Sequence, residues 1–393
     1  MPASPRAPIR SLYVHVPFCA HKCDYCAFYS EVSDGSRMQR YTAALVRELE
    51  LTASELRLDT VFFGGGTPSL LNLEQWERIL TTFERLGLLG AREWTVECNP
   101  ATVSLDKARL WRRFGINRVS LGVQSLDEHL LDRLGRVHSR DMVFKSFDLL
   151  RRGGFENINV DLMFAIPGQT LEVWRATLNE ALALGSEHLS CYEVTYEEDT
   201  PLYAQLKAGR FDVDEDLACA MYDELVSRSG EHGFHQYEVA NFARHQGTPP
   251  ADTAADFLPS RACRHNVNYW RGWDYHGLGP SAAGYVRGVR TRNWADTRLY
   301  CEHLERGQRA IASTEALSPL GRAGEIAAFG LRMPAGWPFA TFAAVTGFDL
   351  RNEWRESMAA LVSRGWAVQD DHHFALTPTG LRFADDAGAE FLR

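Results

Sequence analysis

The chain has no long apolar run. No stretch of its 393 residues could span a bilayer, which requires about 20 consecutive apolar residues, and residues 1–6 carry no apolar segment of the signal-peptide type. Long repeats, low-complexity tracts and lipidation motifs are missing as well. We therefore expect a cytoplasmic protein in a reducing compartment, where clustered thiols serve metal or redox chemistry and not disulfide bonds.

An excess of basic charge is also missing. The chain has 42 Lys and Arg against 51 Asp and Glu, so its net charge is −9 and its isoelectric point is near 5.8. An acidic chain does not attract phosphate backbones by bulk electrostatics, which argues against a nucleic-acid partner. Apolar residues make up 45% and charged residues 24%, an ordinary balance for a chain long enough to form two or three domains.

Cysteine is scarce, but three of the eight cysteines lie close together. Cys19, Cys23 and Cys26 are spaced C-x3-C-x2-C and directly follow a β-rich run at residues 12–18. Three thiolates at this spacing can hold three irons of a [4Fe–4S] cluster and leave the fourth iron open. An open iron can bind a substrate or cofactor. The spacing therefore predicts an iron–sulfur site with a free coordination position.

Zinc is the main alternative for this triplet. His21 lies inside it, but a structural zinc site usually needs four Cys or His ligands, and no second C-x2-C follows at finger spacing. The remaining cysteines are scattered, and most of them are expected to be small core residues. These are Cys98, Cys191, Cys219, Cys263 and Cys301.

The first half of the chain alternates short β-rich runs with helical patterns, which predicts parallel β-α units. The expected strands are 12–16, 60–63, 93–97, 117–121, 157–161 and 188–194. Six units over residues 1–205 are too few for a full eight-unit barrel. We therefore expect an α/β fold of the partial, TIM-like (β/α)6 type.

Polar residues and glycines follow the ends of five successive expected strands. The cysteine loop (residues 19–26) follows the first strand and the glycine run 64–67 the second, while Glu97, Gln124 and Asp161 follow in turn. Each alone has a simpler explanation, such as a tight turn, a helix cap or a solvated side chain. Because the carboxyl ends of parallel strands share one edge of the sheet, we expect a shared ligand pocket.

The second half is expected to form two further regions. Residues 206–310 are a connecting region with a helix near 214–228 and a polar, proline-containing surface loop at 244–259. Residues 311–393 turn helical, with helices expected at 316–331 and 350–364, followed by a small hairpin and a last helix. This order resembles a winged-helix module, which in an acidic chain indicates a packing or interaction surface.

Several motifs together resemble the radical S-adenosylmethionine superfamily, and more narrowly the oxygen-independent coproporphyrinogen III oxidase group. The motifs are Tyr13-Val-His15-Val-Pro-Phe-Cys19-x3-Cys23-x-Tyr25-Cys26, Gly64-Gly-Gly-Thr67-Pro68, Glu97-Cys-Asn-Pro100 and Ser120-Leu-Gly-Val-Gln124-Ser. In this family the open iron chelates S-adenosylmethionine, and one electron cleaves it to methionine and a 5′-deoxyadenosyl radical. By resemblance the cofactor contacts are Tyr13, His15, Tyr25, Gly65, Gly66, Thr67, Glu97, Gln124, Arg136 and Asp161.

Two departures separate the chain from the true oxidases of that group. The oxidases carry a further cysteine two residues after the third ligand, where this chain has Phe28. They also carry a longer N-terminal extension, whereas only 18 residues precede Cys19 here. Both departures indicate a sister subfamily of heme chaperones.

A second motif supports that subfamily. Members of this subfamily carry an H-N-x-x-Y-W element associated with heme binding. The segment His265-Asn266-Val-Asn-Tyr269-Trp270 resembles it. A neutral imidazole can ligate heme iron, and Tyr and Trp offer flat apolar faces to a porphyrin. A histidine packed within an aromatic core is the structural alternative. Cys263 is a lower-ranked thiolate ligand, and the lack of a C-x-x-C-H motif leaves the mode of heme attachment open.

One position departs from the heme-chaperone pattern. Relatives often end a glycine-rich segment in Gly-Ala-His-Gly, whereas this chain has Ala283 in place of the histidine. His276 is a conceivable substitute, although a solvated loop residue is the simpler interpretation.

The sequence thus predicts a cytoplasmic protein that binds a [4Fe–4S] cluster, S-adenosylmethionine and heme. As a heme chaperone it would deliver heme to acceptor proteins, including those of a respiratory chain at the membrane surface. The chain could also form a homodimer. Two alternatives stay open. One is radical decarboxylation of coproporphyrinogen III to protoporphyrinogen IX, and the other is a structural or regulatory iron–sulfur protein.

Overall fold

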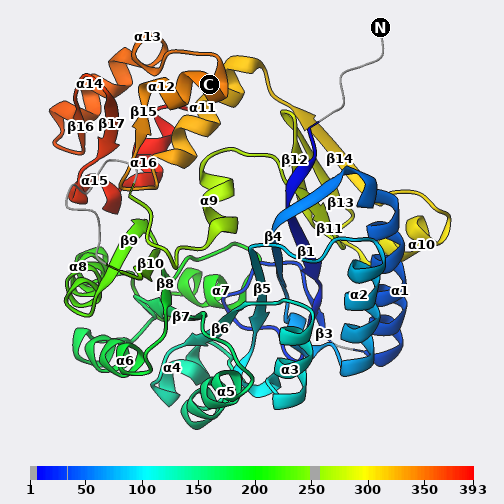
Figure 1. The fold of residues 1–393 in the computed structure, drawn as a ribbon. Coiled ribbons are helices and arrows are strands. Elements are labelled where there is room, and N and C mark those ends of the chain that lie inside the picture. Colours follow the sequence, from blue (N-terminus) through cyan, green and yellow to red (C-terminus); the bar gives the residue numbers. More distant parts are fainter. Residues whose placement is uncertain (1–6, 33, 248–256) are drawn as a thin grey trace, which may run out of the picture. The chain divides into compact units, whose positions relative to one another are not determined.

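The structure, a computed structural model, describes residues 7–32, 34–247 and 257–393, which divide into two compact units (Figure 1). Unit 1 comprises residues 1–186, 192–214 and 274–315, and unit 2 comprises residues 187–191, 215–273 and 316–393. The three consecutive regions expected from the sequence remain a prediction. Within the described part of the chain, no helix is both long and apolar enough to cross a membrane.

Unit 1 is built on parallel strands in the order β11-β1-β4-β5-β6-β7. Their bounds are His276–Leu278, Ile9–Val16, Leu56–Gly65, Glu93–Cys98, Arg118–Gln124 and Ile158–Phe164. The first five predicted strands are therefore confirmed, and β8 (His188–Glu193) takes the sixth predicted place along the chain. Strand β7 runs three residues past Asp161, further than predicted.

Helices connect these strands, as parallel pairing requires. They are α1 (Gly35–Thr52), α2 (Leu73–Arg85), α3 (Leu105–Arg113), α4 (Glu128–Arg133) and α5 (Arg140–Arg152). Two more helices, α6 (Leu171–Ala183) and α7 (Pro201–Lys207), come after β7 in the chain. A capping box fixes the start of α2, because Asn72 and Gln75 each accept a hydrogen bond from the other's backbone N–H. Figure 1 shows α10 (Thr297–Glu305) beside α1.

Large aromatic side chains fill the space between this sheet and its helices. Phe63 of β4 stacks on Trp94 of β5 and contacts Trp76 of α2, which meets Trp111 of α3 edge to face. All four are fully buried. Burying a large apolar side chain contributes roughly 1.5–3 kcal/mol, so this cluster stabilises the sheet–helix interface.

The glycine-rich segment after residue 276 forms a strand, which corrects the prediction for His276. His276 is not a solvated loop residue but lies buried in β11, which pairs in parallel with β1, and its Nε2 lies 3.3 Å from the Glu55 carboxylate. Burial lowers the pKa of His276. Ala283 begins β12 (Ala283–Val286), which pairs with β13 (Val289–Asn293); β14 (Ile311–Ala316) completes this small sheet.

A buried carboxylate fixes this segment to α1. Glu48 is fully buried and accepts hydrogen bonds from the Gly279 N–H (2.8 Å), the Tyr300 hydroxyl (2.7 Å) and the Asn293 amide (2.9 Å). Burial raises its pKa. Nearby, the Tyr41 hydroxyl donates to the His15 carbonyl, so α1 holds β1 as well as β11.

Unit 2 combines a few antiparallel strands with a helical C-terminal part. β8 pairs with β10 (Asn241–Arg244), which pairs with β9 (Phe234–Glu238). The expected helix near 214–228 is α8 (Glu215–Glu231), and α9 (Arg264–Trp270) carries the second motif. Residues 248–256 of the expected 244–259 loop lie outside the described residues.

The C-terminal part agrees with the winged-helix-like prediction. Its helices surround the three-stranded sheet β15-β17-β16 and a core that includes Trp337, Trp354 and Phe391. The expected helix 350–364 is interrupted at Trp354. The elements are α11 (Pro319–Gly330), β15 (Trp337–Pro338), α12 (Phe339–Thr346), α13 (Leu350–Glu353), α14 (Arg355–Ser363), β16 (Ala367–Gln369), β17 (His373–Leu376), α15 (Pro378–Arg382) and α16 (Ala384–Ala389).

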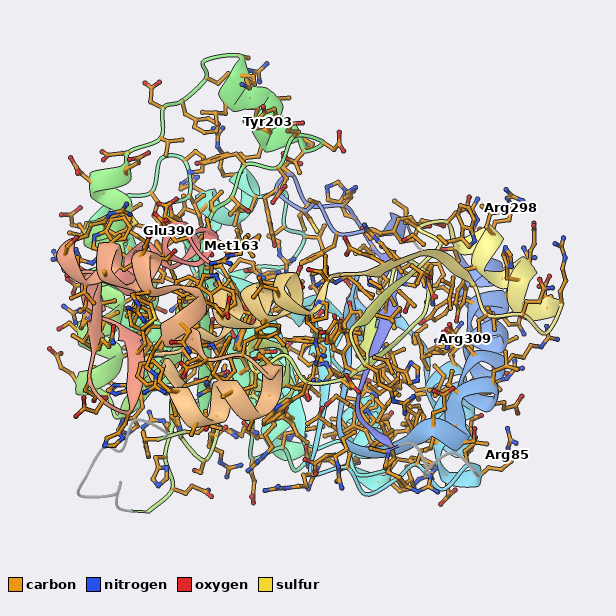
Figure 2. The ribbon with its side chains drawn as sticks, turned by 90° about the horizontal axis from the view of Figure 1, so that it is seen from above. Arg85, Met163, Tyr203, Arg298, Arg309 and Glu390 are labelled. Atoms are coloured by element: carbon orange, nitrogen blue, oxygen red, sulfur yellow. The ribbon has the colours of Figure 1, made fainter. Side chains whose placement is uncertain are left out.

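We predict that Glu48→Ala lowers the free energy of unfolding by at least about 3 kcal/mol, because three buried donors lose their acceptor. Glu48→Gln should cost less, about 1–2 kcal/mol, because one amide oxygen remains. Urea titration followed by circular dichroism measures both. Glu50→Ala on the same helix is the control, since its exposed ion pair with Arg85 (labelled in Figure 2) contributes little. Equal losses for the alanine variants at 48 and 50 would contradict the prediction.

Candidate functional site

The cysteine loop is anchored in unit 1 by its neighbours. The Asp24 N–H donates to the Leu134 carbonyl (3.1 Å), and the Asp24 carbonyl accepts from the Leu202 N–H (2.9 Å). Tyr25 packs against a buried apolar cluster that includes Met163, labelled in Figure 2. The loop is therefore held between the ends of α4 and α7, and its cysteines are presented at fixed places.

The three thiols are half-buried and lie beside hydrogen-bond donors. The Thr67 hydroxyl donates to Cys19 Sγ and Arg136 Nη1 donates to Cys23 Sγ, each at 3.5 Å. Burial raises the pKa of the Cys19 and Cys26 thiols. Among the described residues, no three His, Cys, Asp or Glu side chains are grouped closely enough to bind a single metal ion. Soft thiol donors with a guanidinium alongside suit an anionic iron–sulfur cluster.

The glycine run closes directly against the cysteine loop. The Gly66 N–H donates to the Val16 carbonyl (2.8 Å) and the Thr67 N–H to the Phe18 carbonyl (2.7 Å). A Cβ on Gly66 would lie 2.8 Å from these same two carbonyl oxygens, so only glycine fits. Gly65 has a φ of +102°, and a Cβ there would lie 2.4 Å from the His15 ring.

Two carboxyl groups from neighbouring strands lie in this region. Glu97 at the end of β5 accepts from the Gly65 N–H (3.1 Å). Burial, and then the charge of Asp161, raise the pKa of Glu97 to about 8. Asp161 accepts hydrogen bonds from the Ser120 hydroxyl (3.0 Å) and the Asn159 amide (2.7 Å). The Glu97 carboxyl is thus neutral near pH 7, while the Asp161 carboxyl accepts hydrogen bonds from two side chains.

Ser120 opens one of the quoted motifs and Asn159 belongs to none, and neither was expected at the site. Strand alternation could have found Asn159, which lies on the same face of β7 as Asp161, and Ser120 is its cross-strand partner on β6. Gln124 has a φ of +65°, unusual for a non-glycine residue, at the last position of β6. Arg136 Nη2 donates to the Gly122 carbonyl (2.6 Å), which places Arg136 beside the same strand end.

His15 is fully hydrogen-bonded within the protein. Its Nε2 donates to the Tyr29 carbonyl (2.8 Å), so its Nδ1 accepts from the Tyr13 hydroxyl (3.0 Å). Burial lowers the pKa of His15 to about 4, which keeps the ring neutral. Both ring nitrogens therefore have partners, and His15 joins β1 to the chain just beyond the cysteine loop.

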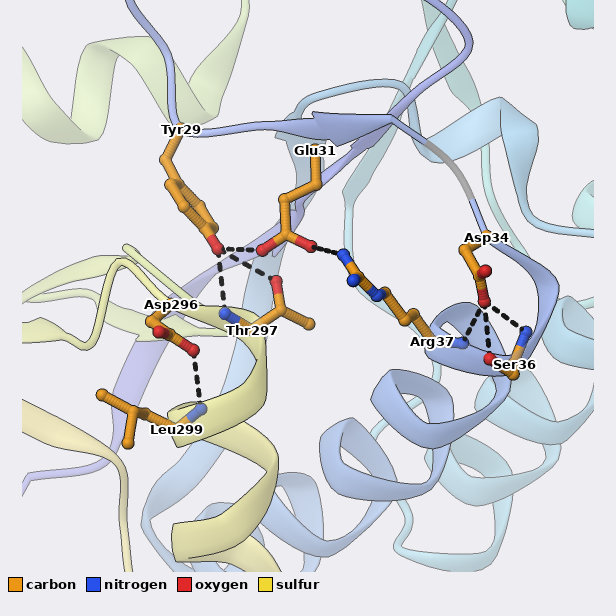
Figure 3. Close-up of polar contacts among 8 residues, drawn as sticks. All are labelled: Tyr29, Glu31, Asp34, Ser36, Arg37, Asp296, Thr297 and Leu299. Atoms are coloured by element: carbon orange, nitrogen blue, oxygen red, sulfur yellow. Dashed lines mark hydrogen bonds and ion pairs between the residues drawn. The ribbon is translucent and has the colours of Figure 1, made fainter.

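Tyr29 extends this connection to α10, a link that the sequence gave no sign of. Its hydroxyl donates to the Glu31 carboxylate and accepts from the Thr297 N–H (2.8 Å), as Figure 3 shows. Glu31 in turn lies 3.3 Å from the Arg37 guanidinium at the start of α1. The segment that leaves the cysteine loop is thereby held between α1 and α10.

The second motif lies on α9 in unit 2. His265 is buried, and its Nε2 lies 2.9 Å from the Tyr269 hydroxyl one helical turn away. Asn266 and Trp270 are half-buried on the same helix, and Cys263 is buried at its N-cap position. The structure therefore brings the predicted cluster and S-adenosylmethionine residues together in unit 1, and the predicted heme residues together in unit 2.

The fold and this site define a class of protein. Residues 13–181 match the model of the radical SAM superfamily, and residues 317–383 match that of the HemN C-terminal domain. Coproporphyrinogen III oxidase (HemN) from Escherichia coli, described as a radical SAM enzyme, has a similar structure. Its TM-score is 0.82 at 21% identity, over 98% of this chain and 91% of the other, which shows a common fold.

Full-length relatives give the family within that class. The heme chaperone HemW of Bacillus subtilis (strain 168) is 32% identical over 98% of this chain and 99% of its own length. The heme chaperone HemW of Escherichia coli (strain K12) is 31% identical over 98% and 99%. This chain belongs to the HemW family of the radical SAM superfamily. That membership assigns it a [4Fe–4S] cluster and S-adenosylmethionine as cofactors, which the thiols and polar groups of unit 1 fit.

We predict that replacing Cys19, Cys23 or Cys26 with Ala removes most of the iron–sulfur absorbance at roughly 400 nm, because each thiolate holds one iron. Anaerobic reconstitution followed by absorbance and iron analysis measures it. Cys219→Ala is the matched control, because this half-buried cysteine lies on α8 outside the loop. Full cluster content in any loop variant would refute the ligand assignment.

A second prediction concerns Glu97 in the cofactor-free chain. Its pKa rises on folding from 4.5 to about 8, so the folded state binds a proton that the unfolded state releases. The contribution of this group to stability is full below pH 4.5, declines as the pH rises, and is lost by about pH 8. Stability relative to Glu97→Gln should therefore fall over that window in urea titrations. A pH-independent difference would show that Glu97 titrates normally.

Proposed function

We propose that this protein is a heme chaperone, which binds heme and delivers it to acceptor proteins. The observation that carries the proposal is the 31–32% identity to heme chaperones HemW over nearly the whole of both chains. Two residues of this chain agree with it. Phe28, 69% exposed, stands where the oxidases carry a further cysteine, and His265 begins the heme-associated motif on α9.

Unit 1 would hold the two cofactors. Cys19, Cys23 and Cys26 are proposed to ligate the cluster, which when bound supplies one-electron chemistry. The contacts to S-adenosylmethionine are proposed to come from the strand ends around Glu97, Asp161 and Gln124. His15 is proposed to act mainly by positioning the loop, since both of its ring nitrogens have protein partners.

Heme is the cargo in this proposal, and α9 would bind it. The Nε2 of His265 bonds to the Tyr269 hydroxyl, so ligation of heme iron through Nε2 would displace this hydroxyl. A neutral imidazole can donate a ring-nitrogen lone pair to the iron. Asn266, Tyr269 and Trp270 would line the porphyrin. The acceptors are proposed to be respiratory-chain proteins, to which the chaperone docks at the membrane surface. The protein is further proposed to be cytoplasmic and to form a homodimer.

We predict that anaerobic titration of the cluster-loaded protein with hemin reaches saturation near one heme per chain. Because the imidazole would be an axial ligand, His265→Ala should weaken binding about tenfold or more, or shift the Soret band. Absorbance across the titration gives both values. His232→Ala is the control, since this exposed histidine also lies in unit 2 but outside the motif.

A parallel assay distinguishes the alternative enzyme. Coproporphyrinogen III is incubated anaerobically with the reduced, S-adenosylmethionine-loaded protein, and the porphyrin products are separated after oxidation. A vinyl-bearing product would favour the oxidase. No saturable hemin binding by the wild-type chain would remove the chaperone proposal.

A further inference from the structure

Trp270, the last residue of the α9 motif, is covered by an arginine. The Arg332 guanidinium carbon lies 5.0 Å from the centre of the Trp270 ring, and Phe329 lies at 6.4 Å. Phe329 is 41% exposed, and the Arg332 side chain is 21% exposed. A cation therefore lies on the aromatic face at the edge of the proposed heme site, within reach of solvent.

Arg332 has one inner and one outer carboxylate partner. Inside, the Glu238 carboxylate is 1% exposed and lies 3.8 Å away, while its other oxygen accepts from the Ala240 N–H at 2.9 Å. Outside, Asp385 lies 2.5 Å from Nη1, with its side chain 91% exposed. The inner carboxylate lies beside the guanidinium without a hydrogen bond, since neither Glu238 Oε2 nor Arg332 Nε has a hydrogen-bond partner among the described residues. The outer ion pair faces water, where ion pairs contribute little, so another carboxylate can replace it.

Heme offers the matching chemistry, an apolar plane with two propionate carboxylates along one edge. Guanidinium groups bind carboxylates with two parallel hydrogen bonds, and they stack on flat rings. Trp270 lies five residues beyond His265, about 7.5 Å along the axis of α9 and roughly 140° around it at 3.6 residues per turn. For a heme whose iron is held at His265, the edge of the macrocycle has to extend around the helix to reach the Trp270 end.

We propose that Arg332 binds a propionate carboxylate of heme and that Asp385 occupies this position when heme is absent. The inference rests on the proposed heme-chaperone function and adds to it a residue that recognises the acidic edge of the cargo. Asp385 then acts as an internal competitor, and its removal must have the opposite effect to removal of Arg332.

The test compares hemin with hemin dimethyl ester, in which both propionates are neutral. Dissociation constants come from Soret titrations of the full chain under anaerobic conditions. The wild-type protein should bind hemin about tenfold more tightly than the ester, because a hydrogen bond to a charged group is lost with the ester. Arg332→Met, which keeps an apolar stem over Trp270, should lose this preference while binding of the ester changes little.

Two further variants make the result specific. Asp385→Asn should tighten hemin binding severalfold and leave the ester unchanged. Arg351→Met is the matched control, because Arg351 also stacks on an aromatic ring (Phe339, 4.8 Å) and pairs with a carboxylate (Asp349, 2.7 Å), but outside α9 and its neighbours. It should keep the wild-type ratio.

The outcomes distinguish failure of the heme-chaperone proposal from failure of the proposed role of Arg332. If the wild-type chain binds neither porphyrin saturably, the heme-chaperone proposal fails and this inference fails with it. If hemin binds but Arg332→Met keeps the full preference over the ester, or Asp385→Asn weakens hemin, only the role of Arg332 is overturned. If Arg332→Met does not fold, as judged by its unfolding midpoint, the sign of the Asp385→Asn effect alone decides.

Discussion

The candidate site of unit 1 depends on the close packing between β1 and the glycine run. His15 lies against Gly65, and the carbonyls beside it accept the backbone N–H groups of Gly66 and Thr67. The ring also bonds to the Tyr29 carbonyl, so the chain that enters the cysteine loop is tied to the chain that leaves it. A side chain at Gly65 or Gly66 would separate these segments, so no larger residue fits at either position.

Burial gives the polar groups around this packing different roles. His15 is neutral because burial penalises its cation, and Glu97 retains a proton to near pH 8 for the corresponding reason. Arg136 provides positive charge beside Cys23. Arg136 thus places positive charge near the thiols, which suits the negative charge that thiolates and a cluster would bring.

Much of unit 1 could be predicted from the sequence because its signals are local. Apolar runs ended by glycine or proline marked the strands, and the polar residues after them marked the strand ends. What escaped prediction depends on contacts between distant residues. No local pattern describes these contacts. They are the pairing of β11 with β1, which includes the buried His276, and the bonds from Tyr29 to Thr297. In unit 2, the motif indicated Trp270, but Arg332, which lies over its ring, and Glu238 beside Arg332 are distant in the sequence.

The pairing of β1 with β11 also bears on how the chain folds. Leu12 is paired with His276, a separation of 264 residues. At about 5–20 residues per second, synthesis of the intervening residues takes roughly 15–50 s, so β1 is made that long before its partner β11. Such long-range parallel pairing is slow to form, and an unpaired strand edge invites association with other chains. The newly made chain therefore has a period of exposure to aggregation that ends only when β11 has left the ribosome.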